Sequence, residues 1–126
     1  MATTVNIWLD DLRSCPDGWL HFKSARMCIA ALDLMLSSGN TVGVLSLDHD
    51  LGACKLCNAN HDGFDIPTHC VHNGTGYDVV CWLEEKVAND LTCNIPAEIR
   101  VHSDNPVGRK RMELGINSLL NMRCRQ

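Results

Sequence analysis

Residues 45–52 of this chain read Leu45-Ser46-Leu47-Asp48-His49-Asp50-Leu51-Gly52, and they carry the strongest indication of the fold class. It ends an apolar run, Val42 to Leu47, with two carboxylates around an imidazole, and the glycine that follows lets the backbone turn away. Apolar runs of this length, bounded by turn residues, are typical of strands buried on both faces. Polar residues after such a strand lie at the rim of the sheet, where ligand crevices form in open α/β folds.

A second apolar segment ends in acids in the same way. Val5 to Leu9 is followed directly by Asp10 and Asp11. If the two strands are parallel neighbours, these carboxylates converge with Asp48, and like charges held that close repel unless a divalent cation or a proton lies between them. Paired aspartates after a strand are also ordinary turn and N-cap residues. Because the motif occurs twice in one small domain, we favour a shared site for Mg²⁺ or Mn²⁺, with Asp10, Asp11 and Asp48 as ligands.

Length and composition predict a single domain over residues 1–126. The chain is 45% hydrophobic and 21% charged, as in ordinary globular proteins. A formal net charge of -4 argues against general binding of duplex nucleic acid through a basic surface, although a small phosphorylated ligand needs only a local positive cluster. There is no apolar stretch of membrane-spanning length and no signal-peptide pattern at the N-terminus, so we expect a cytoplasmic protein without membrane contact.

Eight cysteines are many for this length, and the spacing of three of them suggests a metal. The long loop 51–74 has no clear periodicity, and it contains a CxxC pair and a CxH pair separated by 12 residues. This pattern favours a structural Zn²⁺ with the ligands Cys54, Cys57, Cys70 and His72. His61 and His69 are competing ligands. The alternatives are a loop of exposed thiols, or a disulfide scaffold, which the missing signal sequence disfavours.

The remaining periodicities predict the order β-β-α-β-loop-α-β-α. Strands are expected at 5–9, 19–22, 42–47 and 98–101. Helices are expected after the N-cap Ser24, after Gly74-Thr75-Gly76 and after Asn105-Pro106. Their apolar stripes are Ala25, Cys28, Ile29, Leu32 and Leu36 in the first, Val79, Val80, Leu83 and Val87 in the second, and Met112, Ile116, Leu119 and Leu120 in the third. The alternating second half favours a mostly parallel sheet flanked by helices.

A third strand end carries His102-Ser103-Asp104-Asn105. Ser103 would hydrogen-bond a phosphoryl oxygen, and the helix that begins at Asn105 would direct its N–H groups and positive dipole end toward the same crevice. Arg109 lies in the first turn of that helix, where it is either a phosphate ligand or part of a solvated face. Together with the aspartates, these groups are typical of a site that binds or transfers a phosphoryl group. His49, Asp50 or His102 would act as general acid or base.

Five motifs in this order resemble the cyclic-phosphate processing receiver-like family, a divergent branch of the response-regulator receiver superfamily. They are Trp8-Leu9-Asp10-Asp11-Leu12-Arg13, Pro16-Asp17-Gly18-Trp19, Ser46-Leu47-Asp48-His49-Asp50-Leu51-Gly52, Gly74-Thr75-Gly76-Tyr77-Asp78 and Val101-His102-Ser103-Asp104-Asn105-Pro106-Val107-Gly108-Arg109. The resemblance implies an α/β fold with a reduced receiver or flavodoxin-like sheet that keeps an acidic pocket, and a zinc-binding loop as an insertion. It also implies metal-binding roles for Asp10 and Asp11, a central-strand acid at Asp48, and functional polar positions at His49, Asp50, His102 and Ser103.

Residues and resemblance together favour a metal-dependent phosphoesterase, a phosphoric-ester hydrolase acting on a cyclic or terminal phosphate of a nucleotide or RNA end. The catalytic residues would come from Asp48, His49, Asp50, His102 and Ser103, and phosphate would be bound by Ser103, Asn105 and Arg109. The alternative is a non-catalytic receiver-like module, held rigid by zinc, that binds a phosphorylated ligand or a protein partner.

Overall fold

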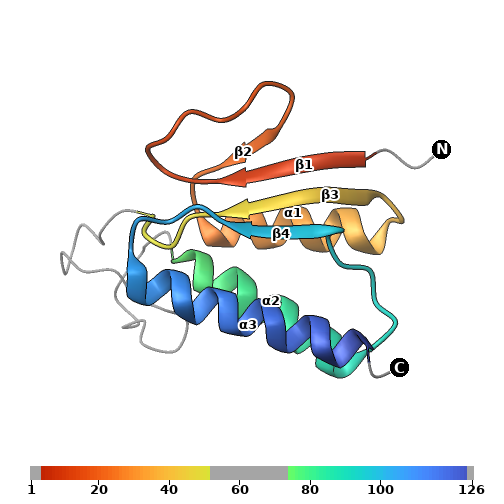
Figure 1. Cartoon of the computed structure of the whole chain (residues 1–126). Helices are drawn as coiled ribbons and strands as arrows, with labels where there is room; N and C mark the ends of the chain where they lie inside the picture. Colours follow the sequence, from red (N-terminus) through yellow and green to blue (C-terminus); the bar gives the residue numbers. More distant parts are fainter. Residues whose placement is uncertain (1–3, 52–73, 125–126) are drawn as a thin grey trace, which may run out of the picture.

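The computed structural model describes residues 4–51 and 74–124, and its elements follow the predicted order (Figure 1). The strands are β1 (Thr4–Leu9), β2 (Leu20–Phe22), β3 (Thr41–Leu47) and β4 (Glu98–Val101), and the helices are α1 (Ala25–Ser37), α2 (Gly76–Asn89) and α3 (Pro106–Cys124). The predicted zinc ligands Cys54, Cys57, Cys70 and His72, with the competing His61 and His69, lie outside the described residues. Zinc binding therefore stays a prediction.

The four strands form one parallel sheet in the order β2-β1-β3-β4. The chain moves across the sheet in one direction from β2 to β3 through α1 and from β3 to β4 through α2. Because such crossovers are right-handed, both helices lie on the same face, and α3 packs beside α2 there (Figure 1). The step from β1 to β2 runs in the opposite direction, and its connection contains no helix. The described residues thus place all three helices on one face of the parallel sheet. The strand order β2-β1-β3-β4 is consistent with a reduced receiver or flavodoxin-like α/β fold, whose full form carries helices on both faces.

The core lies between this helix layer and the sheet. Ile7, Leu9, Leu45 and Leu47 point into it from the two central strands and are fully buried. The predicted stripes of α1 and α2 face them, with Ile29 only partly buried. In α3 the prediction is correct for Met112, Ile116 and Leu119 but wrong for Leu120, whose side chain is 42% exposed. Leu120 follows Leu119 by about 100° around the helix, which carries it past the edge of the buried stripe.

A bulge in β3 sets the register between the two central strands. Val5 pairs with Val42, but Ile7 pairs with Leu45, so β3 contains one residue more than β1 over this interval. The side chain of Asn6 fills the irregularity, because its Oδ1 accepts a hydrogen bond from the backbone N–H of Val44 at 2.9 Å. Beyond the bulge Leu9 pairs with Leu47. The residues that follow, Asp10 and Asp48, therefore leave the sheet at the same level.

Helix ends next to the strand ends are capped by the predicted residues. Ser24 accepts from the N–H of Met27 at 3.2 Å and starts α1. Thr75 and Asp78 form a capping box at the start of α2. At α3, the Asn105 side chain accepts from the N–H of Gly108 at 3.0 Å, and Pro106 occupies the first helical position. Among the described residues, no helix has the length and apolar character needed to cross a membrane.

Candidate metal and phosphate site

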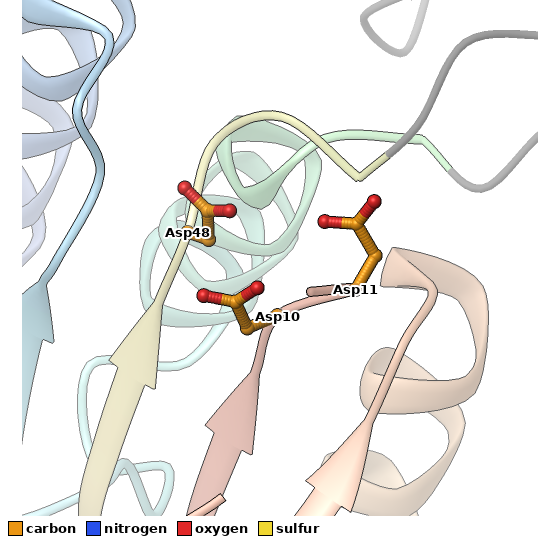
Figure 2. A group of neighbouring side chains, drawn as sticks. All are labelled: Asp10, Asp11 and Asp48. Atoms are coloured by element: carbon orange, nitrogen blue, oxygen red, sulfur yellow. The ribbon is translucent and has the colours of Figure 1, made fainter. Parts of the chain in front are cut away.

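Three aspartates meet at the carboxyl ends of the central strands. Asp10 and Asp11 follow β1, and Asp48 follows β3 (Figure 2). One carboxylate oxygen from each lies within 4.8 Å of the other two, so the three can reach one ion. The backbone fixes this approach, since the N–H of Asp48 donates to the carbonyl of Leu9 at 2.9 Å. The structure therefore brings together the three acids that the sequence analysis grouped.

Asp10 is fully buried, and hydrogen bonds hold its carboxylate in one orientation. Its Oδ1 accepts from the backbone N–H groups of Leu12 and Arg13 at 2.8 and 2.9 Å, and its Oδ2 accepts from the His102 ring at 3.0 Å. Burial alone would raise the pKa of Asp10, but these hydrogen bonds outweigh it and place the pKa below its ordinary value. Asp10 is thus an anion even though it has no contact with bulk water.

Asp48 lies in a different electrostatic environment. Burial, and then the negative charge of Asp10, raise the pKa of Asp48 above its ordinary value. Hydrogen bonds from the Ser103 hydroxyl and from the backbone N–H of His49, the latter at 2.9 Å, only partly oppose this. A cation between the two carboxylates would remove the repulsion that raises the pKa. A cation bound between Asp10 and Asp48 would therefore stabilise the ionised forms of both carboxylates.

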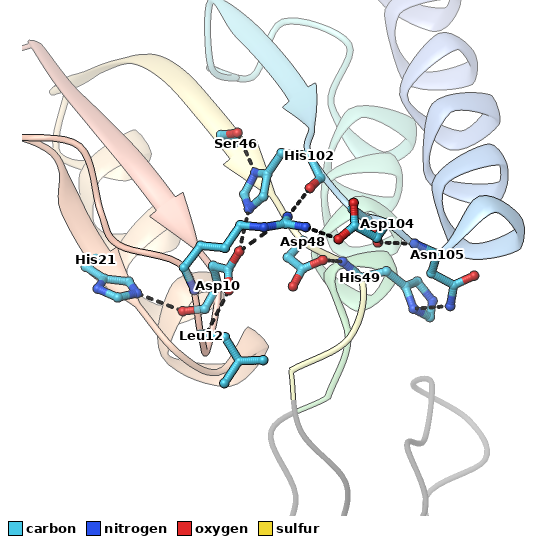
Figure 3. A network of polar contacts seen from close by, with 11 residues as sticks. Asp10, Leu12, His21, Ser46, Asp48, His49, His102, Asp104 and Asn105 are labelled. Carbon is cyan, nitrogen blue, oxygen red and sulfur yellow. Dashed lines mark hydrogen bonds and ion pairs between the residues drawn. The ribbon is translucent and has the colours of Figure 1, made fainter.

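His102 lies behind Asp10, and it is absent from the described lining of the cavity in front of the three acids. Its Nε2 bonds Asp10, and its Nδ1 lies 2.7 Å from the hydroxyl of Ser46 (Figure 3). Burial lowers the pKa of His102 despite the neighbouring Asp10 carboxylate, so the ring is neutral at neutral pH. The predicted proton-transfer residue is thus engaged at both ring nitrogens.

His49 is also absent from the described lining of the cavity. Its buried ring packs against the first turn of α3, where a Cβ on Gly108 would lie 2.5 Å from His49 Cγ. Its Nδ1 contacts Asp50 at 2.8 Å, and the Asn105 amide donates to the Asp50 carboxylate at 3.3 Å. Figure 3 shows the contact of the Asn105 amide with the His49 ring, at 3.5 Å. The Asp50 backbone is fixed by a bridge to Thr75. His49 and Asn105 therefore support Asp50, whose own side chain is 47% exposed at the cavity.

The cavity has a volume of about 460 Å³, which is enough for a nucleotide-sized ligand. Its described lining residues include five aspartates and a single arginine and are Asp10, Asp11, Leu12, Arg13, Asp48, Asp50, Ser103, Asp104 and Asn105. Arg13, which the sequence analysis missed, bonds the carbonyl of His102 and the carboxylate of Asp104, and so joins the β1 end to the β4 end. Its sequence signal was a cation two residues after the Asp10-Asp11 pair.

Arg109 was predicted either to bind phosphate or to belong to a solvated face, and the structure places it on the solvated face. Its guanidinium lies 3.4 Å from Glu113 on the outer side of α3 and is 50% exposed. It is not among the residues that line the cavity. Asn105 does line the cavity, but its side chain is used for the helix cap and for Asp50. Of the three predicted phosphate ligands, Ser103 and Asn105 are therefore at the cavity and Arg109 is not.

The aspartate cluster fits a hard divalent cation. Its donors are carboxylate oxygens, which Mg²⁺ and Mn²⁺ prefer, and two of the three aspartates are only partly buried, so waters can complete the coordination. The raised pKa of Asp48 is the expected property of a carboxylate placed beside another without its counterion. Asp10, Asp11 and Asp48 are the residues that would hold the ion.

Comparison with known proteins identifies a family that the chain matches. A family model described as the cyclic-phosphate processing receiver domain matches residues 5–118. This range includes β1 except for its first residue, the whole of β2, β3, β4, α1 and α2, and most of α3. It therefore contains the three strand ends that form the cavity. No curated protein and no solved structure matches the chain.

Proposed function

Since this chain belongs to the cyclic-phosphate processing receiver domain family, as its motifs predicted, we propose that it is a metal-dependent phosphoesterase. The substrate class is a cyclic or terminal phosphate on a nucleotide or RNA end. The observation that supports this most directly is the placement of Arg13 on the same cavity as the Asp10, Asp11 and Asp48 cluster. Binding of a simple anion would not need three converging carboxylates, whereas hydrolysis assisted by a divalent cation would.

Each cavity residue has a distinct part in this proposal. Asp10, Asp11 and Asp48 hold Mg²⁺ or Mn²⁺, and the bound ion supplies positive charge next to a phosphoryl oxygen. Arg13 binds a second phosphoryl oxygen with a charge-assisted hydrogen bond. Asp50, which is half-exposed at the cavity and held by His49 and Asn105, accepts the proton of the attacking water. Ser103 holds the Asp48 carboxylate through its hydroxyl.

We propose in addition that loop 51–74 binds a structural Zn²⁺ through Cys54, Cys57, Cys70 and His72. The CxxC and CxH spacing supports this. Elemental analysis of protein purified without chelator should give stoichiometric zinc, and Cys57→Ser should lose it. Cys28→Ser is the control, because Cys28 is buried in the core at the α1 stripe. Zinc-free wild-type protein would overturn this part without affecting the aspartate site.

One observation favours the alternative, a module that binds a phosphorylated ligand or a protein partner without turnover. Neither His49 nor His102 is among the residues that line the cavity, so the acid–base chemistry depends on carboxylates. Among the described lining residues there is no imidazole to protonate the leaving oxygen, so solvent water would have to supply that proton. A binding module would not need a proton donor.

A hydrolysis screen decides between the two. The purified protein is incubated with oligonucleotides that end in a 2′,3′-cyclic phosphate or a terminal monophosphate, and with cyclic mononucleotides, in Mg²⁺, Mn²⁺ or EDTA. We expect metal-dependent turnover of one class that Asp48→Asn abolishes. Arg26→Ala, an exposed residue of α1, serves as the control for handling and expression. Ligand binding by calorimetry without turnover of any substrate would establish the binding module instead.

A further inference from the structure

The ring of His102 lies in a hydrogen-bond chain that crosses three strands. Ser46, in the middle of the sheet on β3, reaches the Nδ1 of His102 at 2.7 Å, and the Nε2 of His102 reaches the Asp10 Oδ2 at 3.0 Å (Figure 3). An ionised carboxylate only accepts hydrogen bonds, so the Nε2 must carry the proton. The Nδ1 on the other side of the ring contacts the Ser46 hydroxyl, so both ring nitrogens have a hydrogen-bond partner. The Ser46–His102–Asp10 chain therefore holds the ring in one orientation.

The His102 ring is also held from the side. It stacks on Trp8 with ring centroids 3.9 Å apart and an angle of 2° between the planes, and Trp8 in turn packs edge-on against Trp19 at 6.1 Å. The backbone N–H of His102 donates to the carbonyl of Leu47 at 2.9 Å, which continues the β3–β4 pairing. Rotating the ring into the cavity would therefore break two hydrogen bonds and an aromatic stack.

The hydrogen bonds to the Asp10 carboxylate leave one of its acceptor positions open. Each carboxylate oxygen has about two lone pairs. Two backbone N–H groups occupy Oδ1, and His102 occupies one position of Oδ2. Arg13 Nη1 lies 3.7 Å from Oδ2, beyond hydrogen-bonding distance. One acceptor position on Oδ2 is left, and the ring of His102 sets its direction.

We infer that His102 is a positioning residue, which orients Asp10 as a single-oxygen ligand of the cation through the Ser46–His102–Asp10 chain and does not itself transfer a proton to or from substrate. This inference rests on the cation site of the proposed function. It reassigns His102 from the catalytic set to a supporting one. Outer-shell partners of this kind alter metal affinity by about 10–100-fold when removed.

Substitutions that separate hydrogen bonding from proton transfer test the positioning role of His102. His102→Gln keeps an N–H donor at about the position of Nε2 but cannot act as acid or base, and His102→Leu keeps the bulk without any donor. We expect the Mg²⁺ affinity measured by calorimetry to be about 10–100-fold lower in His102→Leu than in the unmutated protein. In His102→Gln the affinity should be close to that of the unmutated protein. Turnover at saturating Mg²⁺ should likewise survive in His102→Gln.

The control is His21→Leu. The His21 ring contacts the same residue, Asp10, but through its backbone carbonyl at 2.7 Å and not through the carboxylate. We expect its Mg²⁺ affinity to stay close to that of the unmutated protein. Loss of turnover in His102→Gln with normal Mg²⁺ affinity would overturn the inference and restore a proton-transfer role.

A measurement without metal separates this inference from the proposed function. Nitrogen NMR of the ion-free protein should show a proton on the Nε2 of His102, and Ser46→Ala should shift the Nδ1 resonance. A protein with this tautomer but no Mg²⁺ binding would refute the cation site while leaving the hydrogen-bond chain intact. An Nε2 without a proton would overturn the positioning chain, whether or not the protein has hydrolase activity.

Discussion

Asp10 and Asp48 are neighbouring acids whose environments act in opposite directions. Hydrogen bonds lower the pKa of Asp10, whereas burial and the charge of Asp10 raise the pKa of Asp48. Asp10 therefore adds stability above its unfolded pKa, and this is lost as the pH falls through its lowered folded pKa. For Asp48 the native state holds the proton more tightly than the unfolded state, so its contribution to stability declines as the pH rises toward its raised folded pKa.

The first prediction uses this difference. Mg²⁺ must displace the proton of Asp48, so Mg²⁺ affinity should rise with pH through a midpoint above the ordinary pKa of an aspartate. The Ser103 hydroxyl lowers the pKa of Asp48, and Ser103→Ala should therefore move the midpoint to still higher pH. Calorimetric titrations over a pH series measure it. An unchanged midpoint in Ser103→Ala would show that this hydroxyl does not act on Asp48.

The second prediction compares two arginines. Arg13 lines the cavity, whereas Arg109 pairs with Glu113 outside it. Arg13→Ala should weaken binding of inorganic phosphate or a nucleotide by about 1.5–3 kcal/mol, the usual contribution of a hydrogen bond to a charged group. Arg109→Ala should bind like the unmutated protein. The opposite result in calorimetry, with Arg109 essential and Arg13 dispensable, would return the phosphate to the start of α3.

Sequence reasoning found the acids of the site but not the positions of its histidines. Asp10 and Asp48 were predictable because polar residues after parallel strands collect at one edge of a sheet. His49 and His102 also follow strands, but their directions depend on partners that a sequence does not reveal. A gap above Gly108 receives the ring of His49, and the face of Trp8 receives the ring of His102.

At the scale of elements, every strand and helix in the described part of the chain was predictable, because caps and turn residues mark their ends. Ser24 and Asn105-Pro106 locate two helix starts, and Gly39, with a φ of 84°, allows the turn that ends α1. The bulge in β3 was not predictable, since it depends on the Asn6 side chain of another strand. It nevertheless sets the level at which Asp10 and Asp48 meet.

The third prediction concerns the contact between α3 and the β3 end. In an exposed helix, replacing glycine by alanine stabilises by about 0.5–1 kcal/mol. At Gly108 the new Cβ would lie 2.5 Å from the buried His49 ring. We expect Gly108→Ala to destabilise the protein by about 1–3 kcal/mol, as overpacking does. In denaturant unfolding, His49→Ala should remove part of this cost, and purely additive effects would mean that the two residues do not press on each other.

At the scale of the whole molecule, the aspartate site exists only after folding. Asp10 and Asp48 lie 38 positions apart in the sequence and meet only through the pairing of β1 with β3. Their repulsion opposes that pairing in the absence of a cation. A ligand that binds only the native state stabilises it by mass action.

The fourth prediction follows from this coupling. Mg²⁺ at about 100 times its Kd should raise the free energy of unfolding by about 2.7 kcal/mol. Asp48→Asn should lose this increase, yet be more stable than the unmutated protein without the ion, because a repulsive charge has been removed. Thermal unfolding with and without Mg²⁺ measures both effects. A variant that still gains stability from Mg²⁺ would place the ion elsewhere.

The stack of Trp8 on His102 places an intrinsic fluorophore next to the aspartate cluster. Indole emission responds to the charge and hydrogen bonding of an imidazole against its face, and this imidazole is bonded to the buried carboxylate of the cluster. Of the three tryptophans, Trp19 touches the same stack, and Trp82 lies on α2 beneath Lys86. Replacing Trp82 by phenylalanine would leave a fluorescence signal that arises beside the acids, so that occupancy of the site can be followed in solution without any added label.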